Sequence, residues 1–128
     1  SSFAEPRDRM TNVFAYGTLR SKEVREALLG RDVPRFVEPV SVKNFWIHPV
    51  SHGRYPAVVS SETGSQVPGT LLLDISEEDM VILDAFEDKY VKRSVEVFSA
   101  DGVVIATAII YVWNKSLSSL NISKIWSY

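Results

Sequence analysis

The sequence predicts an α+β domain in which a small barrel of mixed β-sheet is flanked by two or three short helices. About six segments have the apolar patterning of strands, and two segments carry helix-capping residues. The dipeptide Asp101-Gly102 between two strand-like runs is a strong hairpin signal, which requires antiparallel pairing. A helix that follows the first strand can instead lead to a parallel neighbour. We therefore expect a mixed sheet, curved into a barrel.

The start of the chain predicts a strand, a turn and a capped helix. Val13 to Tyr16 is a short, mostly apolar strand that ends at Gly17. Ser21 has the side chain of an N-cap for a helix through Leu29, and Gly30 follows as its C-terminal cap. This order places a glycine-containing turn between the first strand and the first helix.

The middle of the chain predicts two strands and two loops. Phe36 to Ile47 is strand-rich, and Pro39 indicates an edge strand or a bend. His48 to Pro56 contains prolines and a glycine and is predicted to be a loop. Ala57 to Ser60 is a short strand, and Glu62 to Gln66 has the residues of a turn.

The second half predicts three strands around a second helix. Val67, Gly69, Leu71, Leu73 and Ile75 alternate, which predicts that they share the buried face of a strand. Ser76 to Asp79 resembles a capping box for a helix to about Glu87. Val91 to Ala100 is the next strand. Val103 to Trp113 is apolar on both faces and is expected to be central and fully covered.

The length of 128 residues fits one domain. Residues 1–9 are polar and are interpreted as a tail, either native or added, and residues 10–128 as the domain. Leu120 to Tyr128 is predicted to be a short helix or an extension. No repeat or linker divides the sequence.

Composition excludes several classes of function. Lys and Arg number 14 against 16 Asp and Glu, so no excess of positive charge favours nucleic acid or an anionic membrane. The chain has no cysteine, which excludes disulfides, thiol nucleophiles and thiolate metal sites. Two histidines, His48 and His52, are too few for a histidine-rich metal site. We expect a cytoplasmic monomer that acts on a small molecule, without metal or cofactor.

The first candidate binding segment is Tyr16-Gly17-Thr18-Leu19-Arg20, between a buried strand and a helix. Gly17 permits a tight turn and the close approach of a ligand to the backbone. The amides of Thr18, Leu19 and Arg20 can converge on an anion or a carbonyl, and the Arg20 side chain can bind a carboxylate. The alternative is an ordinary strand-to-helix turn.

The candidate catalytic residue is Glu87. On a helical wheel it lies on the same face as Met80, Leu83 and Phe86. A carboxylate on an apolar face loses hydration, which raises its pKa toward the range of a general base at neutral pH. The alternative is that the helix frays at its end and Glu87 is solvated.

Three further residues are weaker candidates for a pocket. Arg93 shares a strand face with Val95 and Val97 and, if buried, needs an anionic partner such as Glu87 or a substrate carboxylate. Tyr55 in the central loop and Tyr111 in the last strand can line a pocket. The alternatives are an arginine that reaches solvent and tyrosines that belong to the core.

Five segments in order resemble the gamma-glutamylcyclotransferase-like proteins, which include the plant AIG2-like branch and gamma-glutamylamine cyclotransferase. The segments are Val13-Phe14-Ala15-Tyr16-Gly17-Thr18-Leu19-Arg20, Gly53-Arg54-Tyr55-Pro56-Ala57, Val67-Pro68-Gly69-Thr70-Leu71, Leu83-Asp84-Ala85-Phe86-Glu87 and Ile110-Tyr111-Val112-Trp113. Each motif is short, but the ordered set covers nearly the whole chain from Met10 to Trp113.

The sequence also departs from the family pattern after the glutamate. Asp88 stands where the family often has glycine, and Arg93 keeps its expected spacing. The family tyrosine lies four residues after the glutamate, where this chain has Val91, and Tyr90 comes one residue earlier. A shift of one residue in a strand turns a side chain to the other face.

The resemblance implies a compact α/β barrel and a cofactor-independent cyclisation of the transferase or lyase type. In that reaction the α-amine of a gamma-glutamyl group attacks its own γ-carbonyl, and 5-oxoproline and an amine are released. The resemblance implies that Glu87 is the general acid and base. The resemblance also implies that the loop from Tyr16 to Arg20 forms the pocket. With the candidates found above, we expect the substrate-binding residues to be Tyr16, Gly17, Thr18, Leu19, Arg20, Tyr55, Arg93 and Tyr111. The alternatives are a binding or regulatory module that retains the pocket without turnover, and a structural interaction protein.

Overall fold

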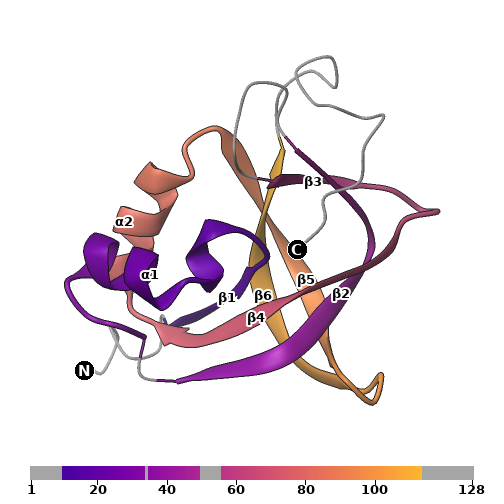
Figure 1. Ribbon diagram of the computed structural model, residues 1–128, viewed down its shortest axis with the longest axis horizontal. Helices are drawn as coiled ribbons and strands as arrows, with labels where there is room; N and C mark the ends of the chain where they lie inside the picture. Colours follow the sequence, from indigo (N-terminus) through magenta and orange to yellow (C-terminus); the bar gives the residue numbers. More distant parts are fainter. Residues whose placement is uncertain (1–9, 34, 50–55, 114–128) are drawn as a thin grey trace, which may run out of the picture.

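The computed structural model describes residues 10–33, 35–49 and 56–113, so the predicted tail, the predicted C-terminal element and Tyr55 lie outside the described residues. Figure 1 shows a strongly curved sheet with helices on one side. The elements are β1 (Thr11–Ala15), the 3₁₀ turn η2 (Thr18–Arg20), α1 (Lys22–Leu29), β2 (Phe36–Pro49), β3 (Pro56–Ser60), β4 (Ser65–Ile75), α2 (Glu77–Phe86), β5 (Tyr90–Ser99) and β6 (Val104–Trp113). No helix in this part of the chain is both long and apolar enough to cross a membrane.

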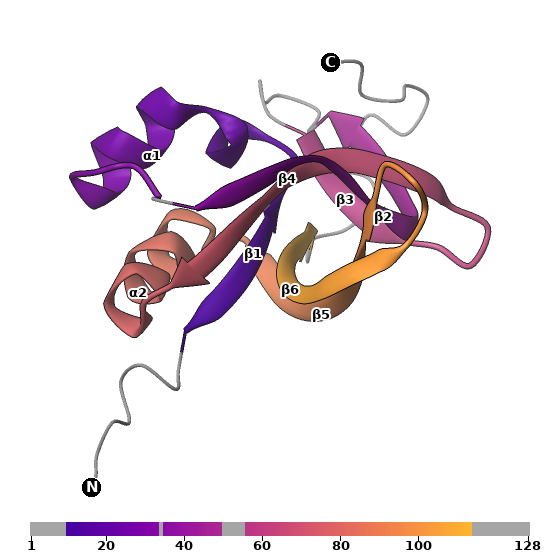
Figure 2. The same ribbon diagram turned by 90° about the horizontal axis from the view of Figure 1, so that it is seen from below.

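The sheet is mixed and closes on itself, as predicted. Its strand order is β3-β2-β4-β1-β6-β5, and a further pairing between β2 and β5 closes all but β3 into a barrel. The pair β1–β6 is parallel, and the other pairs are antiparallel. Figure 2 shows α1 and α2 together on one flank of the barrel. The expectation that the helix after β1 leads to a parallel neighbour is wrong, because α1 leads to β2, which does not pair with β1, and the parallel partner β6 is the last strand described.

Two apolar clusters lie on opposite faces of β1. Phe14 and Tyr16 belong to a cluster that contains only strand and turn residues and fills the barrel. Val13 and Ala15 belong to a second cluster, which packs beneath the helices with Met80 and Leu83 of α2 among its members. Successive side chains of a strand point to opposite faces, so this short strand joins both cores and reaches the helix layer with its C-terminal end.

The helix caps agree with the sequence, with one difference. The Ser21 hydroxyl accepts a hydrogen bond from the Val24 amide, and Gly30 has the left-handed conformation of a C-cap (φ 80°). The Ser76 hydroxyl accepts from the Asp79 amide at 3.1 Å, which is half of a capping box. The Asp79 carboxylate instead binds Arg31, with Oδ2 2.6 Å from Nη2, and so ties the end of α1 to the start of α2.

The prediction that Ile75 shares a face with Val67 and Leu71 is wrong. Val67 and Leu71 lie in the barrel core, whereas Ile75 lies beneath the helices. The register of the β1–β4 pair shifts by one residue between Thr11 and Val13. Asp74 lies in the shifted segment and has a positive φ of 56°. One extra residue in a strand reverses the side-chain alternation beyond it.

Three other predictions about the strands also need correction. Val104 and Ile105 are each 44% exposed, so only the second half of β6 is fully covered. The reason is that Tyr111 is the β6 residue that belongs to the apolar cluster beneath the helices. The helices therefore do not cover the first half of this strand. Of the two alternatives for Pro39, the edge strand is wrong, because β2 pairs with β3, β4 and β5. The irregularity expected there is a register shift in the pairing with β4 between Val37 and Val40. Residues 48 and 49, expected in a loop, extend β2.

Candidate active site

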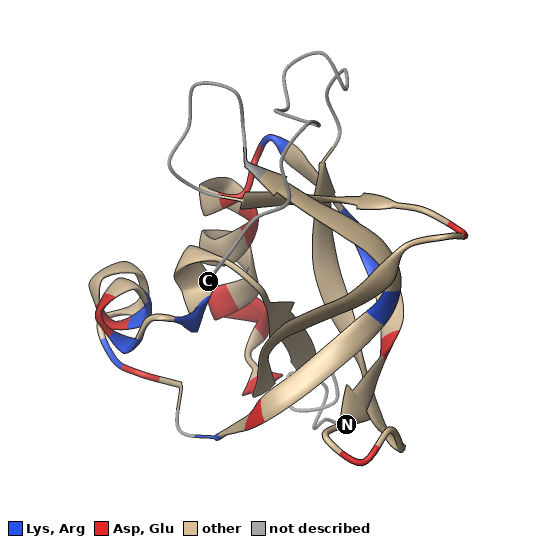
Figure 3. Cartoon of the chain, turned by 45° about the vertical axis from the view of Figure 1, so that its right-hand side comes forward, with Lys and Arg blue, Asp and Glu red and all other residues tan. Residues whose placement is uncertain are grey.

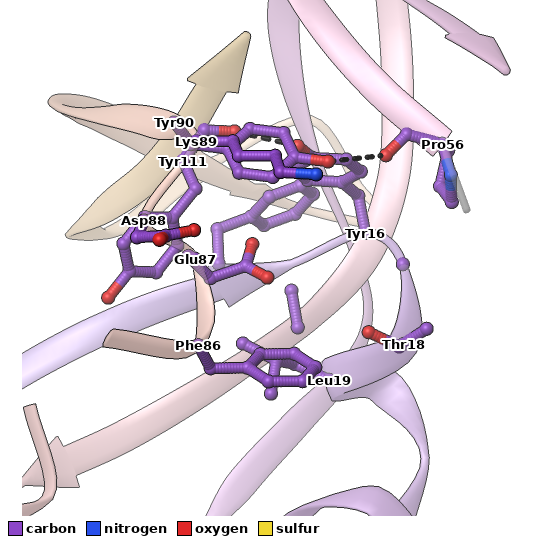
Figure 4. A pocket seen from close by; sticks show the side chains of 13 residues that line it. Tyr16, Thr18, Leu19, Pro56, Phe86, Glu87, Asp88, Lys89, Tyr90 and Tyr111 are labelled. Carbon is purple, nitrogen blue, oxygen red and sulfur yellow. Dashed lines mark hydrogen bonds between the residues drawn. The ribbon is translucent and has the colours of Figure 1, made fainter. Parts of the chain in front are cut away.

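A cavity of about 340 Å³ lies where β1, η2, β3, β6, the end of α2 and the start of β5 meet. Figure 4 shows the side chains around it. The wall consists of Phe14, Ala15, Tyr16, Gly17, Thr18, Leu19, Pro56, Phe86, Glu87, Asp88, Lys89, Tyr90 and Tyr111. Its volume lies in the range that proteins use for small ligands. The sheet and the helix layer thus enclose a space for one small molecule.

Glu87 is the residue at which α2 ends. It is the C-cap, and its amide donates to the Leu83 carbonyl oxygen at 2.9 Å, so the last helical bond is made and the end is ordered. Figure 4 shows the carboxylate directed into the cavity, with Thr18 and Leu19 across from it. Glu87 is half-buried, and the loss of hydration raises the pKa of its carboxyl group from 4.5 to about 7. The cavity therefore contains an acid that can exchange protons near neutral pH.

This raised pKa predicts a pH dependence of stability. The folded state binds the Glu87 proton more tightly than the unfolded chain, so its stabilising contribution is complete below pH 4.5 and is lost as pH rises through about 7. Relative to Glu87→Gln, the free energy of unfolding of the wild type is expected to fall by up to about 3 kcal/mol over that interval. Urea unfolding at a series of pH values measures it, and parallel curves for the two proteins would contradict it.

The turn between β1 and α1 forms the wall opposite Glu87. Within η2 the Arg20 amide donates to the Gly17 carbonyl oxygen and the Ser21 amide to that of Thr18, both at 3.0 Å. The amides of Thr18 and Leu19 precede these bonds and have no acceptor within the turn. Both residues line the cavity, so these amides can donate to an anionic group of a ligand.

Gly17 allows the turn to lie close to β3. A Cβ atom at this position would lie 3.1 Å and 3.3 Å from Cγ and Cδ of Pro56. Pro56 is itself part of the cavity wall. Glycine therefore avoids a tight contact between two parts of the cavity wall, whereas its φ of −127° does not itself demand glycine.

Two buried tyrosines hold the inner end of the cavity. The Tyr16 hydroxyl donates to the Tyr111 carbonyl oxygen at 2.7 Å. The Tyr111 hydroxyl donates to Oδ1 of Asp84 at 2.8 Å, and Oδ2 of Asp84 binds Lys92 at 3.0 Å. Burial, followed by the neighbouring Asp84 carboxylate, raises the pKa of Tyr111 above its ordinary value. Tyr111 therefore presents its ring to the cavity and ties β6 to α2 just before Glu87.

Two expected substrate-binding side chains lie outside the cavity wall. Arg93 is exposed, and its Nη1 donates to the Ser60 hydroxyl at 3.2 Å. Of the two possibilities left open for Arg93, the structure shows the arginine that reaches solvent, because the face that covers Val97 opens toward the start of β5. The Arg20 side chain donates to the Thr70 hydroxyl at 3.3 Å, away from the cavity lining.

Tyr90 was not among the site residues predicted from the sequence, yet it lines the cavity. The Tyr90 amide donates to the Glu87 carbonyl oxygen at 3.0 Å, so a tight turn presents it as the first residue of β5. Its hydroxyl lies 3.4 Å from the Pro56 carbonyl oxygen, and its ring packs edge-on against Trp113. Val91, which has the family spacing, is exposed instead. The turn, which sequence spacing does not reveal, sets the direction of the tyrosine.

Charged groups at the cavity are few. Asp88 and Lys89 are exposed and line it beside Glu87. Figure 3 shows acidic and basic residues interspersed over the rest of the ribbon. Within residues 10–33, 35–49 and 56–113, no group of three or more acidic or histidine side chains could hold a metal ion. The chemistry that these residues can perform is proton exchange at Glu87 and anion binding by backbone amides.

Comparison with known proteins identifies the family of the chain. The sequence profile described as "Gamma-glutamyl cyclotransferase, AIG2-like" matches residues 13–127. The chain belongs to this family. AIG2-like protein C of Arabidopsis thaliana is 34% identical over 105 residues, which cover 81% of this chain and 59% of that protein. The chain thus spans less than two thirds of the length of this family member.

Solved structures of similar proteins show the same fold. An A. thaliana protein known from its solution structure has a TM-score of 0.71 at 27% identity, covering 82% of this chain and 69% of that one. A gamma-glutamyl cyclotransferase has a TM-score of 0.63 at 17% identity, covering 83% of this chain and 68% of that one. The α+β barrel expected from the sequence is therefore the fold of the family.

Proposed function

We propose that this family member is a gamma-glutamyl cyclotransferase, which converts a gamma-glutamyl amine or a related gamma-glutamyl donor to 5-oxoproline and a free amine. The observation that carries the proposal is the half-buried Glu87, whose pKa is raised to about 7, across a cavity from the Thr18 and Leu19 amides. Membership of the family supports the same reaction class.

The reaction needs folding of the substrate more than added reagents. The α-nitrogen forms a bond to the γ-carbonyl carbon, and the bond from that carbon to the leaving nitrogen then breaks. Nucleophile and electrophile belong to one molecule, and their orientation in a confined site can contribute about 7–11 kcal/mol. The enclosed wall formed by Phe14, Tyr16 and Tyr111 suits that task.

Glu87 is proposed to move the protons. The α-ammonium must lose a proton before it attacks, and the leaving nitrogen must gain one before it departs. A single carboxylate can take the first and return it to the second if its pKa is near the working pH. Burial gives Glu87 such a pKa, and its place at an ordered helix end holds it still.

The turn opposite Glu87 is proposed to bind the anionic part of the substrate. The Thr18 and Leu19 amides can donate to the α-carboxylate, which would aim the α-amine and the γ-carbonyl toward Glu87. Asp88, Lys89 and Phe86 are the exposed part of the wall, where the leaving amine would extend.

Product analysis tests the proposal. The protein is incubated with gamma-glutamyl amines and gamma-glutamyl amino acids, and 5-oxoproline is measured by chromatography. Formation of 5-oxoproline that requires the folded protein is the expected result. Binding of these compounds without product would indicate a binding module, and the absence of both product and a thermal-shift response would contradict any role in gamma-glutamyl chemistry.

The same proposal predicts a pH–rate profile. Glu87 must be ionised to accept the first proton, so kcat/KM is expected to rise with pH and to level off above about 7. Initial rates between pH 5 and pH 9, a range of about four units around that value, measure the profile. An inflection near the ordinary 4.5 of a solvated glutamate would contradict the assignment.

A further inference from the structure

A buried arginine lies directly behind the turn that faces Glu87. Arg25 of α1 is only 3% exposed. Its Nε binds Oδ1 of Asp32 at 2.7 Å, and its guanidinium carbon lies 5.4 Å from the centre of the Phe36 ring. A buried charge is stable only when it is paired and hydrogen-bonded. The acceptors of the remaining N–H groups of Arg25 therefore indicate which part of the structure this side chain stabilises.

Those donors are directed at the turn. Nη1 of Arg25 donates to the carbonyl oxygen of Leu19 at 3.0 Å and to that of Arg20 at 2.9 Å. Both carbonyls belong to residues of η2. One guanidinium group therefore binds the turn, and Arg25 is not among the residues that line the cavity. Hydrogen bonds from a charged donor are about twice as strong as neutral ones.

From Arg25, two chains of hydrogen bonds cross the turn to the cavity. The Leu19 carbonyl and the Arg20 amide belong to the same peptide group, and this amide donates to the Gly17 carbonyl oxygen. The Gly17 carbonyl in turn shares its peptide group with the Thr18 amide.

The second chain runs in parallel. The Arg20 carbonyl and the Ser21 amide belong to the same peptide group, and this amide donates to the Thr18 carbonyl oxygen. The Thr18 carbonyl in turn shares its peptide group with the Leu19 amide. Each chain therefore begins at the same cation and ends at one of the two amides that have no acceptor within the turn. Hydrogen bonds in such chains polarise and strengthen one another.

We propose that Arg25 is a positioning residue that orders and polarises the Thr18 and Leu19 amides, and thereby strengthens binding of the substrate's carboxylate. This rests on the proposed function. Arg25 lies behind the turn and touches no substrate; it acts through the two peptide chains. Asp32 holds the guanidinium in place, and the hydrogen bond from Arg25 lowers the pKa of the Asp32 carboxyl so that it stays ionised.

Arg25→Lys is the main test, because lysine keeps the charge but cannot bind Asp32 and both carbonyls in one planar arrangement. We expect KM to rise about tenfold, as for the loss of one hydrogen bond, with kcat within about threefold of the wild type. The inflection of kcat/KM near pH 7 should not move, since Glu87 is untouched. Asp32→Asn, which frees the guanidinium, should raise KM less.

Arg31→Met is the matched control. It removes an arginine–aspartate pair between α1 and Asp79 but no bond to the turn. We expect it to lower the melting temperature and leave KM unchanged. If Arg25 served only to stabilise the fold, its lysine variant would behave in the same way.

Amide NMR separates this inference from the proposed function. In the wild type the Thr18 and Leu19 amide protons are expected to be shifted downfield, and in Arg25→Lys and Asp32→Asn to move upfield and to exchange faster with solvent. This readout needs no substrate, so it applies even if no donor is turned over. Folded variants whose Thr18 and Leu19 amides are unchanged would overturn the inference, as would an unchanged KM in an active enzyme.

Discussion

Exchange of Glu87 for glutamine is expected to lower kcat/KM by about 10³-fold while the barrel stays folded. The amide has nearly the shape of the carboxylic acid but cannot accept a proton at any working pH. Because the charge of Glu87 is costly in its half-buried position, the variant should be at least as stable as the wild type above pH 7. Chromatographic 5-oxoproline assays and urea unfolding measure the two effects.

Asp88→Asn is the control for this experiment. Asp88 also lines the cavity and is adjacent in sequence, but it is exposed. Its amide variant should retain activity within about threefold of the wild type, because Asp88 is exposed and is assigned no part in the proton transfer. Equal losses in both variants would show that a general change of charge matters. Full turnover by Glu87→Gln would remove Glu87 from the mechanism.

Gly69→Ala is expected to have the largest effect on folding. A Cβ on Gly69 of β4 would lie 2.4 Å from the Ala15 carbonyl oxygen and 2.5 Å from Cζ of the Phe14 ring. The obstacle is partly the backbone of β1, so rotation of a side chain cannot relieve it. We expect a loss of at least about 3 kcal/mol in the free energy of unfolding and a fall of about 10 °C or more in melting temperature.

Gly30→Ala separates packing from backbone conformation. Gly30 has a positive φ of 80°, and a Cβ at this position would have no neighbour within 4 Å, so alanine there meets only backbone strain. That cost is about 1 kcal/mol. If urea unfolding shows equal losses of stability in the two alanine variants, close contact between β4 and β1 does not explain why glycine is needed at position 69.

Local sequence signals predicted the elements that depend on neighbouring residues. Ser21 and Gly30 mark the ends of α1 because caps act on adjacent backbone groups. Asp101-Gly102 marks the β5–β6 hairpin for the same reason, with Gly102 at a φ of 84°. Glu87 could be placed at the cavity because its apolar helix face is continuous with that of Leu83.

Features that depend on contacts between distant segments could not be predicted. Ile75 changes face because of one extra residue in β4, and β4 is buried on both faces, so alternation gives no sign of it. Arg25 stands in the polar segment Lys22–Leu29, where an arginine is typical of a solvated surface. Its burial follows from η2 folding over it, which only the Leu19 and Arg20 carbonyls reveal.

The junction between β2 and β5 is short. Its paired positions are Val40 with Ser99 and Ser41 with Phe98, whereas β5 and β6 pair from Tyr90–Trp113 to Phe98–Val104. The β1–β6 pair has one paired position, Val13 with Ile109. Transient local opening is therefore expected to be easier at the β2–β5 junction than between β5 and β6. The β2–β5 junction lies at the opposite end of β5 from Tyr90, so the wall can part there while the residues around Glu87 keep their arrangement. Opening at the β2–β5 junction would therefore occur at the end of β5 that does not line the cavity.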